Sequence, residues 1–130
     1  MNHEAAFAKA FLRSEKRARF IQYLADPKRR REMLGRLDHD LPYLPEWATP
    51  VPGEQDYPEE LVKLLLGKGA GPSCYVIAAG LRCDGTEVAL DQALKQICLQ
   101  ASGAILSCLP GRLAYYRPRA PEPGLLFERP

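Results

Sequence analysis

The chain has 130 residues, of which 46% are hydrophobic and 26% charged, an ordinary composition for one soluble globular domain. No apolar run approaches the roughly 20 residues of a membrane-spanning helix, and residues 1–4 lack the charged-then-apolar layout of a signal peptide. We therefore expect a cytoplasmic protein that does not enter a membrane. The net charge is only +2, but residues 1–37 carry ten Lys and Arg against four Asp and Glu, whereas the remainder carries eight against twelve. This asymmetry suggests a polyanionic partner for the first part of the chain.

Two helices are predicted before residue 40. Across residues 4–25, apolar side chains recur at the 3.6-residue spacing of a helix that buries one face, and basic side chains fall mostly on the other face. Asp26 and Pro27 suit the cap and the first position of a second helix, which runs to about Asp38. Basic side chains on such helices are either a solvated surface or a surface that faces phosphates.

Four consecutive basic residues open the second helix. Lys28 to Arg31 lie where the helix dipole already places positive charge, so local stability would favour acids there. One interpretation is that the free amides and these side chains form an anion site, most naturally for phosphate. The alternative is that they are exposed charges screened by salt. If both helices share one surface, the predicted residues of an anion or nucleic-acid site are Arg13, Lys16, Arg17, Lys28, Arg29, Arg30 and Arg31.

The next stretch contains a histidine and many prolines. His39 lies between two aspartates, but three adjacent side chains at a helix end do not converge on one point, so we assign no metal and no cofactor. Residues 41–57 are interrupted by prolines, which exclude a regular helix or a central strand. Because Tyr43 and Trp47 are interleaved with these prolines, we expect an ordered loop packed on the core. Alternatively, Trp47 and Tyr43 lie on an exposed surface that binds a protein partner.

Residues 58–130 are predicted to form an α/β unit. The clearest element is a hairpin of strands 104–109 and 113–116, because Pro110 and Gly111 suit the two central positions of a tight turn. The glycine-rich segment 67–73 lacks the spacing of a phosphate-binding loop and is interpreted as a connector. The other expected elements are helices at 58–66 and 91–101, a buried strand at 74–79, a short edge strand at 86–90, and a last edge strand or covering segment at 124–127.

The predicted fold is a single α+β domain, residues 1–130. A basic helical pair (1–40) and the ordered proline-rich loop (41–57) precede a small mixed sheet of three to four strands, with helices packed on one face. If strands 74–79 and 104–109 are parallel neighbours, the helix between them forms a right-handed crossover.

The four cysteines contain no C-x-x-C pair, which argues against a zinc knuckle or a dithiol redox motif. Three of them lie in apolar surroundings and are interpreted as buried, reduced thiols. An enzyme that pairs Cys108 with His39 in a pocket near Tyr115 is one remaining interpretation, but an apolar strand disfavours the thiolate. We therefore assign no catalytic residue.

Three stretches together are similar to those of small uncharacterised bacterial proteins. They are Phe-Leu-Arg at residue 12, Arg-Phe-Ile-Gln-Tyr-Leu-Ala-Asp-Pro-Lys-Arg-Arg at 19–30, and Leu-Ser-Cys-Leu-Pro-Gly-Arg-Leu-Ala-Tyr-Tyr at 106–116. The resemblance covers most of the chain. It implies one compact unit that includes the basic helices, and it implies no activity. From the residues themselves, a non-catalytic module that binds nucleic acid or another polyanion ranks above a protein-interaction module and above an enzyme.

Overall fold

The structure is a computed structural model that describes residues 2–130. The hairpin around Pro110 and Gly111 forms the centre of the fold. Strand β4 (Ala104–Leu109) pairs with β5 (Leu113–Arg117), and the N–H of Arg112 donates to the carbonyl of Leu109 at 2.9 Å across the turn. Gly111 has a φ of +73°, a conformation that glycine adopts without steric cost. The predicted hairpin is confirmed.

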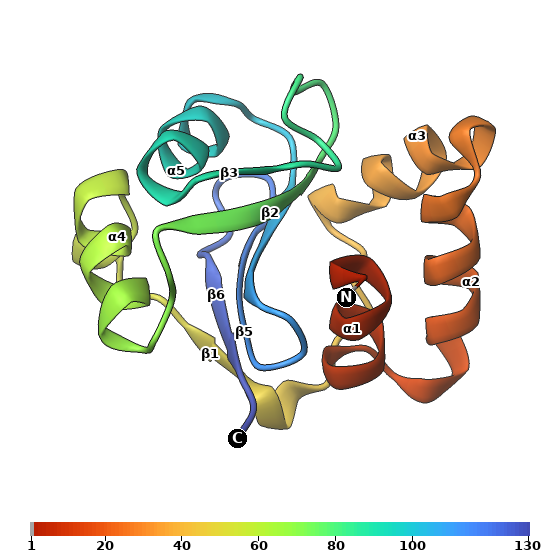
Figure 1. Cartoon of the computed structure of the whole chain (residues 1–130), viewed down its shortest axis with the longest axis horizontal. Helices are drawn as coiled ribbons and strands as arrows, with labels where there is room; N and C mark the ends of the chain where they lie inside the picture. The colour runs from red at the N-terminus through yellow and green to blue at the C-terminus, as the bar shows by residue number, and fades with distance from the viewer. Residues whose placement is uncertain (1) are drawn as a thin grey trace.

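Four further strands extend this hairpin into one sheet with the order β1-β6-β5-β4-β2-β3 (Figure 1). Within residues 2–130 the sheet has six strands, and every neighbouring pair is antiparallel. The α+β class is therefore confirmed, whereas the predicted mixed sheet of three to four strands is wrong. The additional strands are β1 (Ala48–Pro50), β2 (Ser73–Ala78), β3 (Glu87–Ala89) and β6 (Leu125–Glu128).

Two pairings account for this difference. The proline-rich loop contributes β1, which pairs with β6, so that β6 lies inside the sheet and not at its edge. Pro50 is tolerated because β1 is an edge strand, where a missing N–H breaks no ladder. At the other side, the chain reverses through the β2–β3 hairpin before the following helix crosses the sheet. That reversal makes β2 and β4 antiparallel neighbours, so the parallel crossover between them does not exist.

Helices cover both faces of the sheet, and the prediction of helices on one face is wrong (Figure 1). The physical reason is that the central strands are apolar on both faces, which requires two layers of cover. Val76, Leu106 and Tyr115 lie in one core, and Ile77 and Ile105 lie in the other. The first core is covered by α4 (Pro58–Gly67) and α5 (Leu90–Leu99), and the second by α1 (His3–Phe11), α2 (Ser14–Ala25) and α3 (Pro27–Gly35).

The long helix predicted for residues 4–25 is divided at Leu12 and Arg13 into α1 and α2. At this break the N–H of Arg13 donates to the carbonyl of Pro42 at 2.9 Å, and the N–H of Leu44 donates to the carbonyl of Phe11 at 2.7 Å. The proline-rich loop thus satisfies backbone groups that a helix end leaves free. The second predicted helix is confirmed as α3, which ends in a short 3₁₀ turn, Arg36–Asp38.

The loop of residues 41–57 combines turns with one strand. It contains two 3₁₀ turns, Pro45–Trp47 and Gly53–Gln55, on either side of β1. Both edge strands of the sheet, β1 and β3, are three residues long. Among residues 2–130, no helix has the length and apolar character needed to span a bilayer.

Candidate functional site

A groove beside α2 and α3 gathers four basic side chains, two from α2, one from the residue before α2 and one from the 3₁₀ turn after α3. Its cavity volume is about 130 Å³. Phe20 and Met33 contribute apolar atoms to its lining, and Asp40 is its one carboxylate. We call it the basic groove, and its remaining lining residues are Arg13, Lys16, Arg19, Arg36 and Pro42.

The charges of the basic groove are poorly balanced. Arg13 Nε lies 3.7 Å from Glu15 Oε1, and Arg36 Nη2 lies 3.8 Å from Glu32 Oε1, with all four side chains substantially exposed. Exposed pairs at such distances contribute little, so both guanidinium groups remain available to a ligand. In the described chain, residues 2–130, Lys16 has no carboxylate within ion-pair distance.

The structure distributes the predicted anion-binding residues over two places. Arg13 and Lys16 line the basic groove, and Arg17 is half-buried with its Nε donating to the carbonyl of Leu12 at 2.8 Å. Lys28 and Arg31 are exposed in the first turn of α3, which begins where α2 ends, about 18 Å along the axis of α2 from Arg13 at 1.5 Å per residue. The predicted residues therefore do not share one pocket.

The first turn of α3 does not leave its amides free for an anion. The Asp26 side chain accepts a hydrogen bond from the N–H of Lys28 at 2.9 Å and so supplies the negative charge that this helix end favours. Arg29 donates to the Tyr23 hydroxyl at 2.6 Å and lies over the Tyr23 ring, with its Cζ 4.8 Å from the centroid. The structure therefore does not support the interpretation that free amides and basic side chains form one anion site here.

Arg30 belongs to an internal ion-pair network. Its Nη1 lies 2.8 Å from Glu4 Oε2, and its Nε and Nη2 donate to the two oxygens of Asp84, both at 2.9 Å. Nη1 also donates to the carbonyl of Leu24 at 3.0 Å, and only 19% of the side chain is exposed. Hydrogen bonding to Asp84 raises the pKa of Arg30, against the opposing effect of burial. Since its donors are engaged, we leave Arg30 out of the candidate surface.

A serine, a histidine and a glutamate also meet, between β4, α1 and β3. His3 Nδ1 lies 2.8 Å from Ser107 Oγ, and His3 Nε2 lies 3.2 Å from Glu87 Oε1. However, Ser107 is only 1% exposed, and the His3 ring is stacked on Tyr75 with the centroids 5.0 Å apart. A substrate carbonyl has no access to the hydroxyl, so we interpret these contacts as the attachment of α1 to the sheet.

The pairing of Cys108 with His39 is not formed. Cys108 packs in the core beneath α4 and α5, whereas His39 is exposed and lines a cavity with Tyr43 and Tyr116, whose ring packs in the opposite core. Tyr115 is fully buried, and its hydroxyl donates to Asp56 at 2.5 Å. The structure therefore does not bring Cys108, Tyr115 and His39 together in one pocket.

We expect Cys108 to react slowly with iodoacetamide at neutral pH. Burial raises the pKa of its thiol to about 12, so the reactive thiolate is on the order of 10⁻⁵ of the population at pH 7. The measurement is mass spectrometry of Cys108-containing peptides after timed alkylation, with the same protein in urea as the control. Equal labelling rates in buffer and in urea would contradict the buried position of the thiol.

The loop aromatics are engaged within the chain. The guanidinium of Arg129 lies 4.8 Å from the centroid of the half-buried Trp47 ring, and the Tyr43 ring packs edge-on against Phe127 at 5.6 Å. Tyr43 also lines a cavity of about 370 Å³. Three prolines contribute to the same lining, Pro50, Pro118 and Pro123. The cavity is therefore the remaining support for the alternative that this loop binds a protein partner.

Arg19 and Arg36 were not among the predicted site residues. Arg19 has a sequence signal, because it follows Lys16 by three residues and so lies on the same helix face. Arg36 has none, since its place beside α2 depends on how α3 packs. In residues 2–130 no three His, Cys, Asp or Glu side chains group closely enough to hold a metal ion. No family model, curated protein or solved structure matches this chain, so a function must be argued from its geometry.

Proposed function

We propose that this protein is a non-catalytic module that binds nucleic acid through the basic groove. The observation that carries the proposal is the convergence of four basic side chains on one cavity that holds a single carboxylate. Placing like charges three residues apart on a helix, as with Lys16 and Arg19, costs a few tenths of a kcal/mol. A bound polyanion would offset this repulsion. The fold itself does not require two like charges at these positions.

The surface beyond the groove extends the same charge along α2. Lys28 is exposed in the first turn of α3, which begins where α2 ends, about 18 Å along the axis of α2 from Arg13, whereas Arg31 lines a separate pocket with Gly80 and Asp84. A nucleic-acid strand carries a phosphate about every 3.4 Å along a duplex axis, so this span corresponds to about five phosphates. A strand that follows α2 would contact the basic groove and Lys28.

The contacts available are to phosphates and not to bases. Phe20, the aromatic residue of the basic groove, is only 2% exposed, and the ring of Tyr23 is covered by Arg29. Neither ring is free to stack on a base, so we expect binding that depends little on sequence.

Binding should be strongly salt-dependent and should require Lys16 and Arg19. The double variant Lys16→Glu/Arg19→Glu is expected to weaken binding of a labelled duplex oligonucleotide by at least about tenfold, and to lower the slope of log affinity against log salt by about two. The measurement is a filter-binding titration between about 50 and 200 mM salt.

The matched control is Lys63→Glu/Lys95→Glu. These lysines are exposed on α4 and α5, on the opposite face of the sheet, and the change in net charge is identical. The control should bind as the wild type does, apart from a small general loss. Failure of the wild type to retain oligonucleotide at low salt, or equal losses in both double variants, would refute the proposal.

A protein partner at the proline-rich loop ranks second. The cavity beside Tyr43 favours it, but Trp47 and Tyr43 already pack against Arg129 and Phe127. These contacts explain the aromatic residues without a partner.

A further inference from the structure

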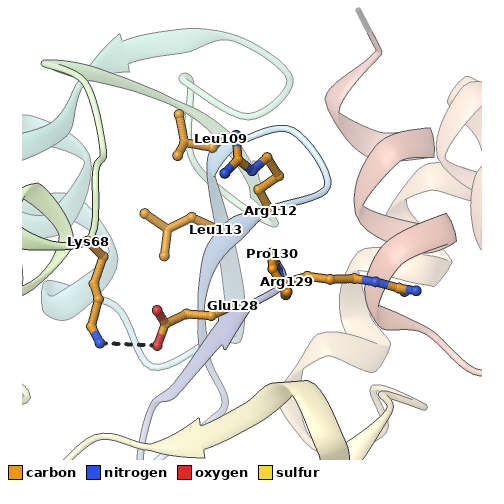
Figure 2. A pocket seen from close by; sticks show the side chains of 7 residues that line it. All are labelled: Lys68, Leu109, Arg112, Leu113, Glu128, Arg129 and Pro130. Atoms are coloured by element: carbon orange, nitrogen blue, oxygen red, sulfur yellow. Dashed lines mark ion pairs between the residues drawn. The ribbon is translucent and has the colours of Figure 1, made fainter.

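A second cavity opens at the end of the sheet where the β4–β5 turn meets the C-terminal end of α4 (Figure 2). Its volume is about 310 Å³, within the size range of small-molecule sites, and it shares no lining residue with the basic groove. We call it the turn cavity. Three separate segments supply its lining, which comprises Lys68, Leu109, Arg112, Leu113, Glu128, Arg129 and Pro130.

One wall of the turn cavity is apolar. Leu109 and Leu113 come from the two strands of the central hairpin, and Figure 2 shows Leu109 beside Arg112 and Leu113 between Arg112 and Lys68. Leu113 is only 2% exposed and is part of the core beneath α4, while Leu109 packs against that core. The exposed apolar surface of this wall therefore comes mainly from the partly buried Leu109, which packs on the core that contains Leu113.

The charges around the turn cavity leave one cation without a partner. Lys68 Nζ lies 3.4 Å from Glu128 Oε1, the pair drawn as a dashed line in Figure 2. Arg129 points away from the cavity, where its Nη1 donates to the carbonyl of Ala10 at 2.8 Å. Within residues 2–130, Arg112 has no carboxylate within ion-pair distance.

The position of Arg112 is fixed by its backbone. Its N–H donates to the carbonyl of Leu109 at 2.9 Å, and its own carbonyl accepts from the N–H of Arg129 at 2.8 Å. The exposed guanidinium of Arg112 therefore extends from a backbone that hydrogen bonds hold on both sides.

We propose that the turn cavity binds a small monocarboxylic acid with an apolar body. The planar guanidinium of Arg112 matches a carboxylate in a two-point hydrogen bond, and the apolar body lies against Leu109 and Leu113. One unmatched positive charge suits one negative charge. Because Glu128 is paired with Lys68, the lining offers a ligand the single charge of Arg112, whereas the basic groove, with four cations, suits a polyanion.

Octanoate is the probe that tests this proposal. In a methyl-resolved NMR titration of the full chain, octanoate should shift the Leu109 and Leu113 methyl signals in a saturable way. Acetate keeps the carboxylate but lacks the apolar body, and octylamine has the opposite charge, so both should bind at least about tenfold more weakly.

The variant Arg112→Ala should bind octanoate about tenfold more weakly, as expected for the loss of a hydrogen bond to a charged group. Arg82→Ala removes an exposed arginine elsewhere and should bind as the wild type does. The groove variant Lys16→Glu/Arg19→Glu should also bind octanoate normally, which separates this proposal from nucleic-acid binding. Absence of saturable shifts at the two leucines, equal binding of acetate, or unchanged affinity in Arg112→Ala would overturn it.

Discussion

Replacing Arg30 with alanine is expected to lower the free energy of unfolding by about 3 kcal/mol. The change leaves the carboxylates of Glu4 and Asp84 without their cation, in positions where their side chains are only 12% and 19% exposed. Removing one partner of a buried ion pair is costly because the remaining charge stays desolvated. The network also joins three segments, α1, α3 and the β2–β3 loop, so the loss is not confined to one helix.

Urea denaturation followed by circular dichroism measures this effect. The matched control is Arg31→Ala, which removes an exposed arginine from the next position and should change stability by less than about 0.5 kcal/mol. A double-mutant cycle with Asp84→Ala should show strong coupling, because both variants remove the same hydrogen bonds. Equal effects of Arg30→Ala and Arg31→Ala would show that the internal ion pairs contribute nothing.

Replacing Gly103 with alanine should destabilise the protein by about 3 kcal/mol or more, and the variant is expected to accumulate as insoluble protein. A Cβ at this position would lie 2.1 Å from the carbonyl oxygen of Leu37 and 2.8 Å from the nitrogen of Asp38. Both atoms belong to the backbone, so no side-chain rotation relieves the overlap. The start of β4 would have to move away from the turn after α3, and the 2.7 Å hydrogen bond from the Gly103 N–H to Asp38 would be lost.

Gly35→Ala provides the matched control. A Cβ there meets no atom within 4 Å, and the residue is the last of α3. Alanine in a helix is favoured over glycine, so this variant should be unchanged or up to about 1 kcal/mol more stable. The comparison of the two urea midpoints is the measurement, and a similar loss in both variants would contradict the close approach at Gly103.

The local elements were predictable because their signals are local. The Pro110-Gly111 turn, the Asp26-Pro27 helix start and the Pro58 helix start each depend on residues within one turn of chain. The sheet was not predictable in the same way. Nothing near Pro50 indicates that residues 48–50 pair with a strand that begins 75 residues later, so that strand was expected at an edge.

The residues of the candidate site show the same difference between local and long-range signals. Lys16 was identified from helical spacing alone, and it lines the basic groove. Arg30 was misassigned because Glu4 and Asp84 are 26 and 54 residues away, and no local pattern reveals such partners. Arg36 was missed because only the packing of α3 against α2 brings its side chain to the groove. Long-range packing decides which cations face solvent and which serve the fold.

The short edges of the sheet bear on how copies of this chain behave at high concentration. Each outer strand exposes the hydrogen-bonding groups of only three residues, and on one side Pro50 removes a donor, while on the other α5 begins directly after Ala89. Intermolecular strand addition, which starts amyloid growth, needs a longer and flatter template than either border supplies. Fibrils should therefore form only after the sheet itself has opened, and a substitution that lengthens an outer strand should promote them more than one that weakens the helices.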